Sequence, residues 1–493
     1  MNILFVYTTQ DAQSEEKPLQ RQENIAFGIS YISSYLKTHG HITKLFVSTR
    51  STNIQNIDKL IDNFKPKLIC FSATATQYPF ALNISKHVKS SYPDIFLIIG
   101  GTHITIFPEE ALNDMKKNSF NALCLGEGEK PLFELVEQLE KNIYPTNINN
   151  LWIKNGKNVE KNPTRPFIQD LDSLPFPDKD MWQELIYYPD SQGSILLGRG
   201  CPYLCTYCSN HAIRKVSSGK YVRTRSPENI IKELEETSAK FPKIQSFHLE
   251  IETFGVNLNW ALELCGKLEE LNTRTIQPLK FEVNLRITPN SKPENLDNLF
   301  KAMKKCNIQR INVGLESGSE RVRRDILKRN ESNEDILLAT NIAKKYGLKV
   351  NYYVLIGIVG ETINDFKETI DFCREANPSI AELQIFFPYP GCDLYLAAKE
   401  QGLLGSSLDP EMERYKATLD LPDFSRKQIQ QNFVLFEYNV FKGRRHFYKI
   451  ALKVASWLFR SNYYSNKFYR MLTSFALFYR LKEFLLKPEE DKT

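Results

Sequence analysis

At 493 residues the chain suggests roughly two to four domains, and its 42% hydrophobic and 25% charged residues are typical of a globular protein. The net charge of +6 is mild at this length and does not by itself indicate nucleic acid, and no apolar run is long enough to span a bilayer. Nine cysteines without a secretory signal favour a reducing cytoplasm. We therefore expect neither a disulfide-rich secreted protein nor a membrane-spanning one.

Residues 1–141 alternate between apolar runs and segments with helical periodicity. This alternation predicts a parallel, doubly wound (Rossmann-like) sheet that binds ligands at the carboxyl ends of its strands. The predicted strands are Ile3–Tyr7, His41–Ser48, Lys67–Ser72, Ile95–Ile99 and Leu123–Leu125, and the predicted helices are Ile25–His39, Ile57–Asn63, Tyr78–Ser91 and Pro131–Glu140.

Small residues follow the last three of these strands. The loops are Ser72-Ala73-Thr74-Ala75, Gly100-Gly101-Thr102-His103 and Gly126-Glu127-Gly128-Glu129. Small side chains let a backbone approach a large planar ligand closely. Any one loop is explained as an ordinary tight turn, but three at successive strand ends favour a binding edge.

Residues 142–190 predict a connector, because they are rich in Asn, Lys, Pro and Asp. A hairpin is expected around Asn155-Gly156. The run Leu174–Asp178 contains two prolines, so it fits neither a helix interior nor a central strand.

Residues 191–402 show a second alternation, of six strand–helix units. It predicts a partial parallel (β/α)6 barrel with its chemistry at the strand C-terminal ends. The predicted strands are Ser194–Leu197, Ser246–Ile251, Lys280–Leu285, Arg310–Gly314, Lys349–Ile356 and Ile380–Phe387, and the predicted helices are Pro227–Phe241, Asn259–Leu271, Leu296–Lys305, Glu320–Arg324, Asn333–Tyr346 and Thr362–Ala376. Residues 403–493 predict a helical, basic and aromatic C-terminal domain with a helix at Phe424–Val440.

Three cysteines lie close together after the first strand of this second pattern. Cys201, Cys205 and Cys208 have the spacing C-x3-C-x2-C, with Gly, Pro and Tyr among them. Thiolates are the usual ligands of iron–sulfur clusters, and three of them would leave one iron of a [4Fe–4S] cluster free. A structural zinc site needs four protein ligands. Three fortuitous cysteines are the remaining interpretation, and it is weak because chance cysteines scatter.

The stretch Gly198–Cys208 resembles the cluster loop of radical S-adenosylmethionine (SAM) enzymes. Its fuller form, Gly-Arg-Gly-Cys-Pro-Tyr-x-Cys-x-Tyr-Cys, resembles the subfamily with an N-terminal cobalamin-binding domain. The resemblance implies that the three cysteines hold a [4Fe–4S] cluster whose free iron binds SAM. The reduced cluster would cleave SAM to a 5′-deoxyadenosyl radical, which takes a hydrogen atom from an unactivated carbon. Methylcobalamin would then donate a methyl group, and a second SAM would restore it.

The resemblance extends to the N-terminal loops, where Gly-Gly-x-His and Gly-Glu-Gly-Glu recur in the subfamily. It implies a set of cobalamin-binding residues, namely Ser72, Thr74, Gly100, Gly101, His103, Gly126, Glu127, Gly128 and Glu129. The Asp-x-His-x-x-Gly signature is absent, so cobalamin is expected without the lower-face histidine which that signature supplies. His103 is a candidate neighbour of the corrin ring and is not assigned to cobalt.

Later strand ends match further motifs of the family. They imply SAM-binding positions at Glu252, Arg286, Glu316, Ser317, Gly357, Glu361 and Pro388. Two matches are incomplete, because Ile251 replaces one acid of the usual pair and Val359 replaces a proline. Arg286 fits a solvated rim charge equally well. No catalytic residue is assigned.

The stretch Phe441–Lys482 is basic and aromatic and contains no Asp or Glu. We interpret it first as a helical cap over the substrate cavity, with peripheral contact to anionic lipid as the alternative. RNA binding is a third option, but aromatic residues at helical spacing more often form a core. The expected partners are a small-molecule or lipid-like substrate and an electron donor such as flavodoxin or ferredoxin, without nucleic acid. A cytoplasmic location is expected, with membrane association as the alternative.

Three other functions stay open at this point. The same cofactors serve radical ring formation, rearrangement or oxidation without methyl transfer. A tRNA methylthiotransferase is less favoured, since such relatives carry a second cluster and Cys70 and Cys124 are alone in the N-terminal region. A non-enzymatic metal-binding protein is the last alternative.

Overall fold

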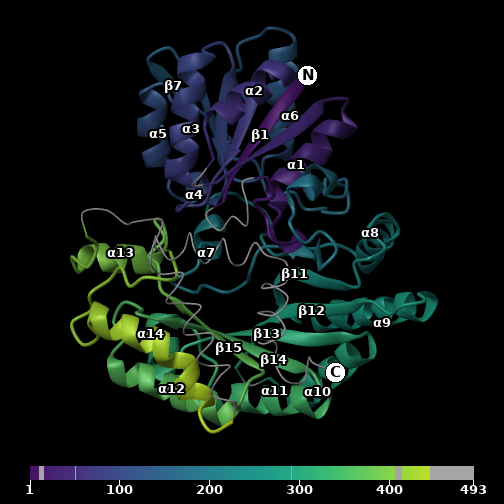
Figure 1. Cartoon of the computed structure of the whole chain (residues 1–493), viewed down its shortest axis with the longest axis vertical. Coiled ribbons are helices and arrows are strands. Elements are labelled where there is room, and N and C mark those ends of the chain that lie inside the picture. Colours follow the sequence, from purple (N-terminus) through teal and green to yellow (C-terminus); the bar gives the residue numbers. More distant parts are fainter. Residues whose placement is uncertain (10–15, 50–51, 290, 406–412, 445–493) are drawn as a thin grey trace. The chain divides into compact units, whose positions relative to one another are not determined.

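The structure is a computed structural model of the whole chain (Figure 1), and it describes residues 1–9, 16–49, 52–289, 291–405 and 413–444. The chain divides into two units. The first comprises Met1–Glu252, Leu271–Leu279 and Tyr389–Leu396, and the second Thr253–Glu270, Lys280–Pro388 and Ala397–Thr493. The domain boundaries predicted at residues 141, 190 and 402 stay predictions.

The N-terminal sheet has seven strands in the order β2-β1-β3-β4-β5-β6-β7. Its strands are β1 (Asn2–Thr8), β2 (Ile42–Ser48), β3 (Leu68–Ser72), β4 (Phe96–Gly100), β5 (Ala122–Cys124), β6 (Leu151–Asn155) and β7 (Asn158–Lys161). The first five are parallel, which confirms the predicted doubly wound sheet. The strand order reverses between β1 and β3, and ligands of such sheets bind in the crevice at this kind of switch point.

Helices cover both faces of this sheet (Figure 1), because alternate strand residues bury their side chains on opposite sides. Ile3 and Phe5 pack beneath α1 (Phe27–Thr38) and α6 (Glu129–Glu140). Leu4 and Val6 belong to the opposite core. The helices of that second face are α2 (Gln55–Phe64), α3 (Tyr78–Ser91) and α5 (Pro108–Lys116). Two shorter helices are η1 (Gln22–Asn24) and α4 (Thr102–Ile106).

The expected hairpin around Asn155-Gly156 is present, but it extends the sheet instead of lying in a connector. Strand β6 pairs antiparallel with β5, and β7 pairs antiparallel with β6. Leu151 and Ile153 alternate with the less buried Trp152, so β6 places an apolar face on the core of α1 and α6. The short helices α4 and α5 were not predicted.

The rest of the connector carries little regular structure. Leu174–Asp178 forms neither helix nor strand, as its prolines predict. It leads into η2 (Asp180–Leu185), whose Trp182 is fully buried in the core of the first sheet. The indole Nε1 of Trp182 donates to the Ser30 hydroxyl of α1 at 2.8 Å.

The second sheet confirms the six predicted strands, which follow one another in the order β15-β14-β13-β12-β11-β8. They are β8 (Gly193–Leu196), β11 (Ser246–Phe254), β12 (Lys280–Leu285), β13 (Ile308–Glu316), β14 (Lys349–Ile356) and β15 (Ile380–Ile385). The β8–β11, β12–β13, β13–β14 and β14–β15 pairs are parallel. Consecutive parallel strands with intervening helices are the arrangement expected of a partial barrel.

Three of the helices between these strands begin at residues whose side chains cap them. Ser226 accepts a hydrogen bond from Asn229 N at the start of α8, and Ser332 and Thr362 form capping boxes at the starts of α11 and α12. The helices are α8 (Pro227–Lys240), α9 (Leu258–Arg274), α10 (Pro293–Lys305), α11 (Asn333–Lys345) and α12 (Ile363–Ala376). The helix predicted at Glu320–Arg324 is instead a π turn, η3 (Val322–Ile326). Short elements are β9 (Gly198–Arg199), α7 (Asn210–Ile213), β10 (Arg223–Thr224) and α13 (Asp393–Glu400).

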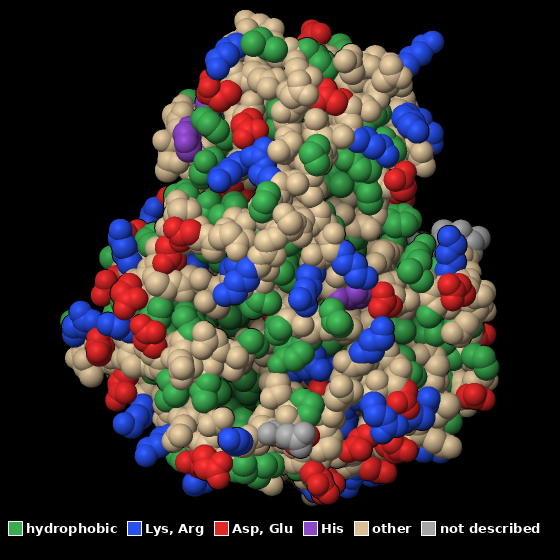
Figure 2. Space-filling model, turned by 180° about the vertical axis from the view of Figure 1, so that it is seen from behind, with side chains coloured by type: hydrophobic (Ala, Val, Ile, Leu, Met, Phe, Trp, Pro, Cys, Tyr) green, Lys and Arg blue, Asp and Glu red, His purple; other side chains and the backbone are tan. Residues whose placement is uncertain are grey.

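Beyond this sheet, α14 (Arg426–Phe441) confirms the predicted helix at Phe424–Val440. The basic and aromatic stretch Phe441–Lys482 lies, from residue 445 on, outside the described residues. In the described part of the chain, every helix is too short or too polar to cross a lipid bilayer. On the face that Figure 2 draws, basic and acidic side chains are mixed over the surface.

Replacing Trp182 should destabilise the first unit strongly. Trp182→Ala removes a fully buried indole and leaves a cavity, which costs roughly 3–5 kcal/mol of unfolding free energy. Ser30→Ala is the matched control, because it removes only the hydroxyl that accepts from Trp182 and should cost about 1–2 kcal/mol. Urea unfolding measures both values. Equal losses in the two variants would contradict the packing role of the indole.

Candidate functional site

The three cysteines lie on the loop between β9 and α7, in the first unit. Gly200 has a φ of +88°, and a Cβ there would lie 2.3 Å from the carbonyl oxygen of Tyr221. Glycine is therefore required for this loop to pass beside Tyr221. The loop then turns so that the backbone N–H of Cys208 donates to the carbonyl of Cys205 at 3.1 Å.

The environment of the cysteines suits thiolates that are bound to a metal. Cys205 is buried, and Cys201 and Cys208 are half-buried. Burial raises the pKa of the Cys208 thiol to about 12. A bound cation is what keeps such a thiol deprotonated at neutral pH. Cys208 also accepts hydrogen bonds from Asn210, at 3.5 Å from its backbone N and 3.8 Å from Nδ2. The donor set thus fits an iron–sulfur cluster.

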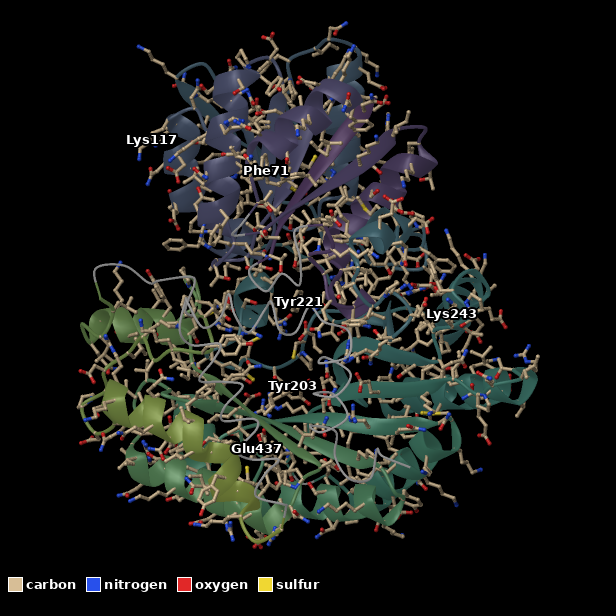
Figure 3. All side chains as sticks on the ribbon, viewed as in Figure 1. Phe71, Lys117, Tyr203, Tyr221, Lys243 and Glu437 are labelled. Atoms are coloured by element: carbon tan, nitrogen blue, oxygen red, sulfur yellow. The ribbon has the colours of Figure 1, made fainter. Side chains whose placement is uncertain are left out.

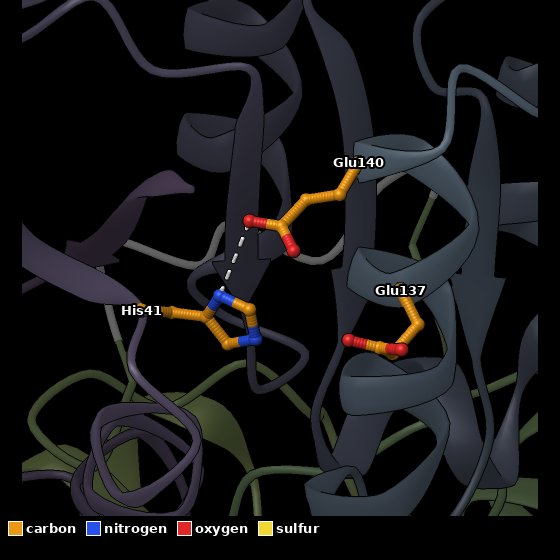
Figure 4. A group of neighbouring side chains, drawn as sticks. All are labelled: His41, Glu137 and Glu140. Carbon is orange, nitrogen blue, oxygen red and sulfur yellow. Dashed lines mark ion pairs between the residues drawn. The ribbon is translucent and has the colours of Figure 1, made fainter.

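A different group has the tight spacing of a single-ion site (Figure 4). In His41, Glu137 and Glu140, one ligand atom from each lies within 4.8 Å of the others. The N-terminal ammonium of Met1 already pairs with Glu140 at 2.7 Å, so its carboxylate is neutralised. The sulfurs of Cys201, Cys205 and Cys208, which all lie in the described part of the chain, do not come within 4.8 Å of one another as a set of three. Wider spacing is expected when each thiolate binds a different iron.

A cavity of about 290 Å³ opens at the carboxyl ends of the first sheet's strands. Phe71 and Tyr221, both labelled in Figure 3, are among its lining residues. The lining includes seven of the nine residues predicted to bind cobalamin, namely Ser72, Gly100, Gly101, Gly126, Glu127, Gly128 and Glu129. This volume is near the lower end for ligand sites, so it encloses part of a ligand as large as cobalamin. The position and small residues of the cavity fit that cofactor.

The glycines are what keep this edge of the sheet open. Gly101 has a φ of +99°, and a Cβ there would lie 2.7 Å from the backbone of Ala73. A Cβ at Gly128 would lie 2.7 Å from Ile32 Cδ1. Gly101 excludes a larger residue because its neighbour is backbone and its φ is positive, whereas a side chain at Gly128 would require Ile32 to shift.

Thr74 and His103 do not line the cavity. His103 is buried, with its Nε2 3.1 Å from Glu110 Oε2 and its ring centroid 4.9 Å from that of Tyr78. The placement of His103 near the corrin ring stays a prediction, as does the role of Thr74.

The glutamates of the Gly-Glu-Gly-Glu loop contact arginines of the cluster segment. Arg199 places Nη1 2.9 Å from Glu127 Oε1 and Nη2 2.6 Å from Glu129 Oε1. Arg223 Nη1 lies 2.9 Å from the same Glu127 oxygen. The two arginines are neighbours because Arg223 of β10 lies opposite Arg199 of β9 in an antiparallel strand pair. Burial tends to lower the pKa of Arg199, yet Glu129 and Glu127 raise it above its usual value.

Aromatic rings also contact the two arginines. The Arg199 guanidinium lies 5.0 Å from the ring centroid of Tyr31, and that of Arg223 lies 5.0 Å from that of Phe167. Arg199 and Arg223 also line the cavity. Sequence reasoning missed both arginines, although Arg199 stands within the recognised Gly-Arg-Gly-Cys stretch.

The predicted SAM-binding residue Glu252 lies near the end of β11, in the same unit as the cysteines. Its side chain is exposed, and its charge adds to the raised pKa of Cys208 after the larger effect of burial. Glu252 therefore lies near the cluster loop, and its contact with SAM stays a prediction.

In the second unit, Arg286 and Glu316 belong to one ion-pair network at the ends of β12 and β13. Arg286 Nη2 lies 3.1 Å from Glu331 Oε2, and Arg329 lies 2.7 Å from Glu331 and 3.6 Å from Glu316. Glu316 has a φ of +61°, which is strained for a residue other than glycine. Such strain is typical of functional sites and is held here by the surrounding charges.

The other predicted SAM-binding positions are buried or shape their own loops. Ser317 is fully buried, with Oγ 3.2 Å from Thr369 Oγ1. Gly357 has a φ of +80°, and its N–H donates to Glu361 Oε2 at 2.6 Å. Pro388 is buried after β15. Direct contact of these residues with SAM stays a prediction, as it does for Glu252, Arg286 and Glu316.

Comparison with known families agrees with both halves of this site. Residues 195–373 match the family model of the radical SAM superfamily, and residues 21–136 match that of the B12 binding domain. The chain belongs to the radical SAM enzymes that carry a cobalamin-binding domain. The predicted fold class and the three cofactors are thereby confirmed.

Relatives of this family match most of the chain. An uncharacterized methyltransferase of Pyrococcus horikoshii is 26% identical over 82% of this chain and 85% of its own length. The anaerobic magnesium-protoporphyrin IX monomethyl ester cyclase of Rubrivivax gelatinosus is 25% identical over 90% of this chain and 80% of its own. The solved structure of the cobalamin-dependent SAM radical enzyme OxsB shares the fold, with a TM-score of 0.68 at 18% identity, covering 99% of this chain and 74% of that one.

Removing one cysteine of the loop should abolish cluster uptake. After anaerobic reconstitution, the wild-type protein should bind about four irons per chain and absorb visible light as iron–sulfur proteins do. Cys205→Ala should lose most of the iron and the absorbance. Cys373→Ala is the matched control, because Cys373 is equally buried but lies on α12. Iron uptake by Cys205→Ala at the wild-type level would contradict the ligand assignment.

Glu361 should make stability depend on pH. Burial raises its pKa from 4.5 to about 8, against the lowering effect of the N–H groups of Gly357 and Ile358. Between these values the folded chain keeps a proton that the unfolded chain releases, so the contribution of Glu361 to stability falls as pH rises. Glu361→Gln stays neutral and should gain stability relative to wild type between pH 5 and pH 8.

Urea unfolding at both pH values measures this difference. Glu368→Gln is the control, because Glu368 is exposed on α12, the helix that follows Glu361, and its difference from wild type should stay constant. An equally constant difference for Glu361→Gln would show that Glu361 is ionised in the folded protein.

Proposed function

We propose that the protein methylates an unactivated carbon of a small-molecule or lipid-like substrate, using SAM, a [4Fe–4S] cluster and cobalamin. One observation carries the proposal. Arg199, two residues before Cys201, lines the candidate cobalamin cavity and pairs with Glu127 and Glu129 of its rim. The cluster loop and the cobalamin cavity therefore share a wall, and such proximity is what a reaction that uses both cofactors requires.

When bound, the cofactors supply the radical that activates the substrate and the methyl group that is transferred. The residues of the chain hold and orient them. Cys201, Cys205 and Cys208 hold the cluster, and Glu252 is the candidate to orient the amino group of SAM. The apolar side chains of the cavity, among them Phe71, keep water away from reactive groups. A one-electron donor such as flavodoxin or ferredoxin completes the reaction.

A second candidate uses the same cofactors without methyl transfer. The Rubrivivax relative covers 90% of this chain and is named as a ring-forming cyclase. A radical formed on the substrate would then be oxidised or would close a ring. The residues described above serve this reaction equally well, so the products must distinguish the two.

The two remaining alternatives have less support. Cys70 and Cys124, the cysteines of the N-terminal sheet, are buried under its helices. Burial raises the pKa of Cys70 well above its usual value and that of Cys124 to about 12. Two buried thiols do not supply the ligands of a second cluster, so a methylthiotransferase is not favoured. A non-enzymatic metal-binding protein does not explain the match to both cofactor domains.

Product analysis tests methyl transfer. The reconstituted, cobalamin-loaded protein is incubated with SAM, a low-potential reductant and candidate substrates. Methylation should yield about one S-adenosylhomocysteine for each 5′-deoxyadenosine, because one SAM is cleaved and another donates the methyl group. Both should disappear in Cys205→Ala. 5′-Deoxyadenosine with a product that lacks an added methyl group would favour the cyclase or oxidase reaction. No SAM cleavage under any condition would favour the metal-binding protein.

A further inference from the structure

A hydrogen-bonded chain runs from the cobalamin cavity to one of the cluster cysteines. The hydroxyl of Tyr221 donates to Asn210 Oδ1 at 2.6 Å. Asn210 in turn directs its backbone N–H and its Nδ2 at Cys208 Sγ, at 3.5 and 3.8 Å. Tyr221 lines the cavity. Tyr221 therefore connects the cavity to Asn210, the residue that donates to Cys208.

The hydrogen-bonding groups of Cys208 and Tyr221 fix the orientation of the Asn210 side-chain amide. A metal-bound thiolate accepts hydrogen bonds, so the amide presents N–H to the sulfur and its oxygen to Tyr221. Donation by the Tyr221 hydroxyl to Oδ1 polarises the amide and strengthens its N–H donors. Reversing the amide would direct its oxygen at the sulfur and lose both interactions.

Tyr221 is held firmly in this position. The backbone carbonyl of Tyr221 accepts from Arg223 Nε at 3.0 Å and leaves no room for a side chain at Gly200. Its ring centroid lies 5.1 Å from that of Phe167. Tyr221 is itself buried, so a ligand that fills the cavity must pack against a ring that cannot swing away.

We infer that Asn210 and Tyr221 are positioning residues that set the reduction potential of the cluster, and that Tyr221 makes this potential respond to the occupancy of the cobalamin cavity. Hydrogen bonds to the sulfurs are one of the factors that set the potential of an iron–sulfur cluster, because they stabilise the more negative, reduced form. The inference rests on the proposed function, since it needs a cluster on Cys208 and cobalamin in the cavity.

The test is a redox titration of the reconstituted full chain, followed by electron paramagnetic resonance, with and without hydroxocobalamin. Asn210→Leu has a similar volume but lacks the side-chain donor. It should shift the one-electron equilibrium about tenfold toward the oxidised cluster, which corresponds to about 59 mV. Tyr221→Phe keeps the ring and removes only the hydroxyl. It should shift the equilibrium less in the same direction and remove the response to hydroxocobalamin.

Tyr352→Phe is the matched control, since Tyr352 is also buried and its hydroxyl also makes a hydrogen bond, with Thr340 Oγ1 at 2.6 Å, but it takes no part in the hydrogen bonds to Cys208. It should keep the wild-type potential and its response to hydroxocobalamin. Circular dichroism checks that each variant is folded, and Tyr221→Phe tests the inference even if Asn210→Leu does not fold.

The outcomes separate this inference from the proposed function. A wild-type protein that binds no cluster would overturn both. A wild-type cluster that cleaves SAM, together with unchanged potentials in Asn210→Leu and Tyr221→Phe, would overturn this inference alone. A shifted potential in Asn210→Leu with an unaltered cobalamin response in Tyr221→Phe would overturn the role of Tyr221.

Discussion

Two guanidinium groups and two carboxylates meet where the Gly-Glu-Gly-Glu loop lies beside the strand that leads to the cysteines. Glu129 and Arg223 are buried, and buried charges are tolerated only when they are paired and hydrogen-bonded. Moving either loop would leave one charge without its partner. The position of the cysteine loop relative to the cavity is thus enforced by the cost of separating these charges.

The second unit also has paired arginines and glutamates at the ends of its strands. Arg286, Arg329 and Glu331 form a buried network beneath the loop that begins at Glu316. Several acidic residues of the motifs therefore form ion pairs or hydrogen bonds with neighbouring parts of the protein. Glu361 is a further case, because its carboxyl accepts from the backbone of its own loop at Gly357. Motif residues of this kind hold their own loops in place, while glycines such as Gly101 line the cavity.

Much of the fold and the set of cofactors could be predicted from the sequence, and the three cysteines as cluster ligands stay a prediction. The parallel strands of both sheets follow from runs of apolar residues, and the helices from their periodicity. Long-range pairings could not be predicted, because Glu127 and Arg199 are 72 residues apart and neither position reveals the other. The antiparallel pairing of β6 with β5 is non-local in the same sense. Asn210 belongs to no motif, and only its place two residues after Cys208 hinted at its contact with the sulfur.

The hairpin that extends the first sheet affects the tendency of this protein to aggregate. A parallel sheet that ended at β5 would expose the backbone donors and acceptors of a short, buried, apolar strand. Strand β6 covers them, and the outer strand β7 (Asn158–Lys161) presents Glu160 and Lys161 beside its unpaired edge. Charged side chains on an edge strand discourage another chain from adding to the sheet. The hairpin thus protects the cofactor-binding sheet from edge-to-edge aggregation.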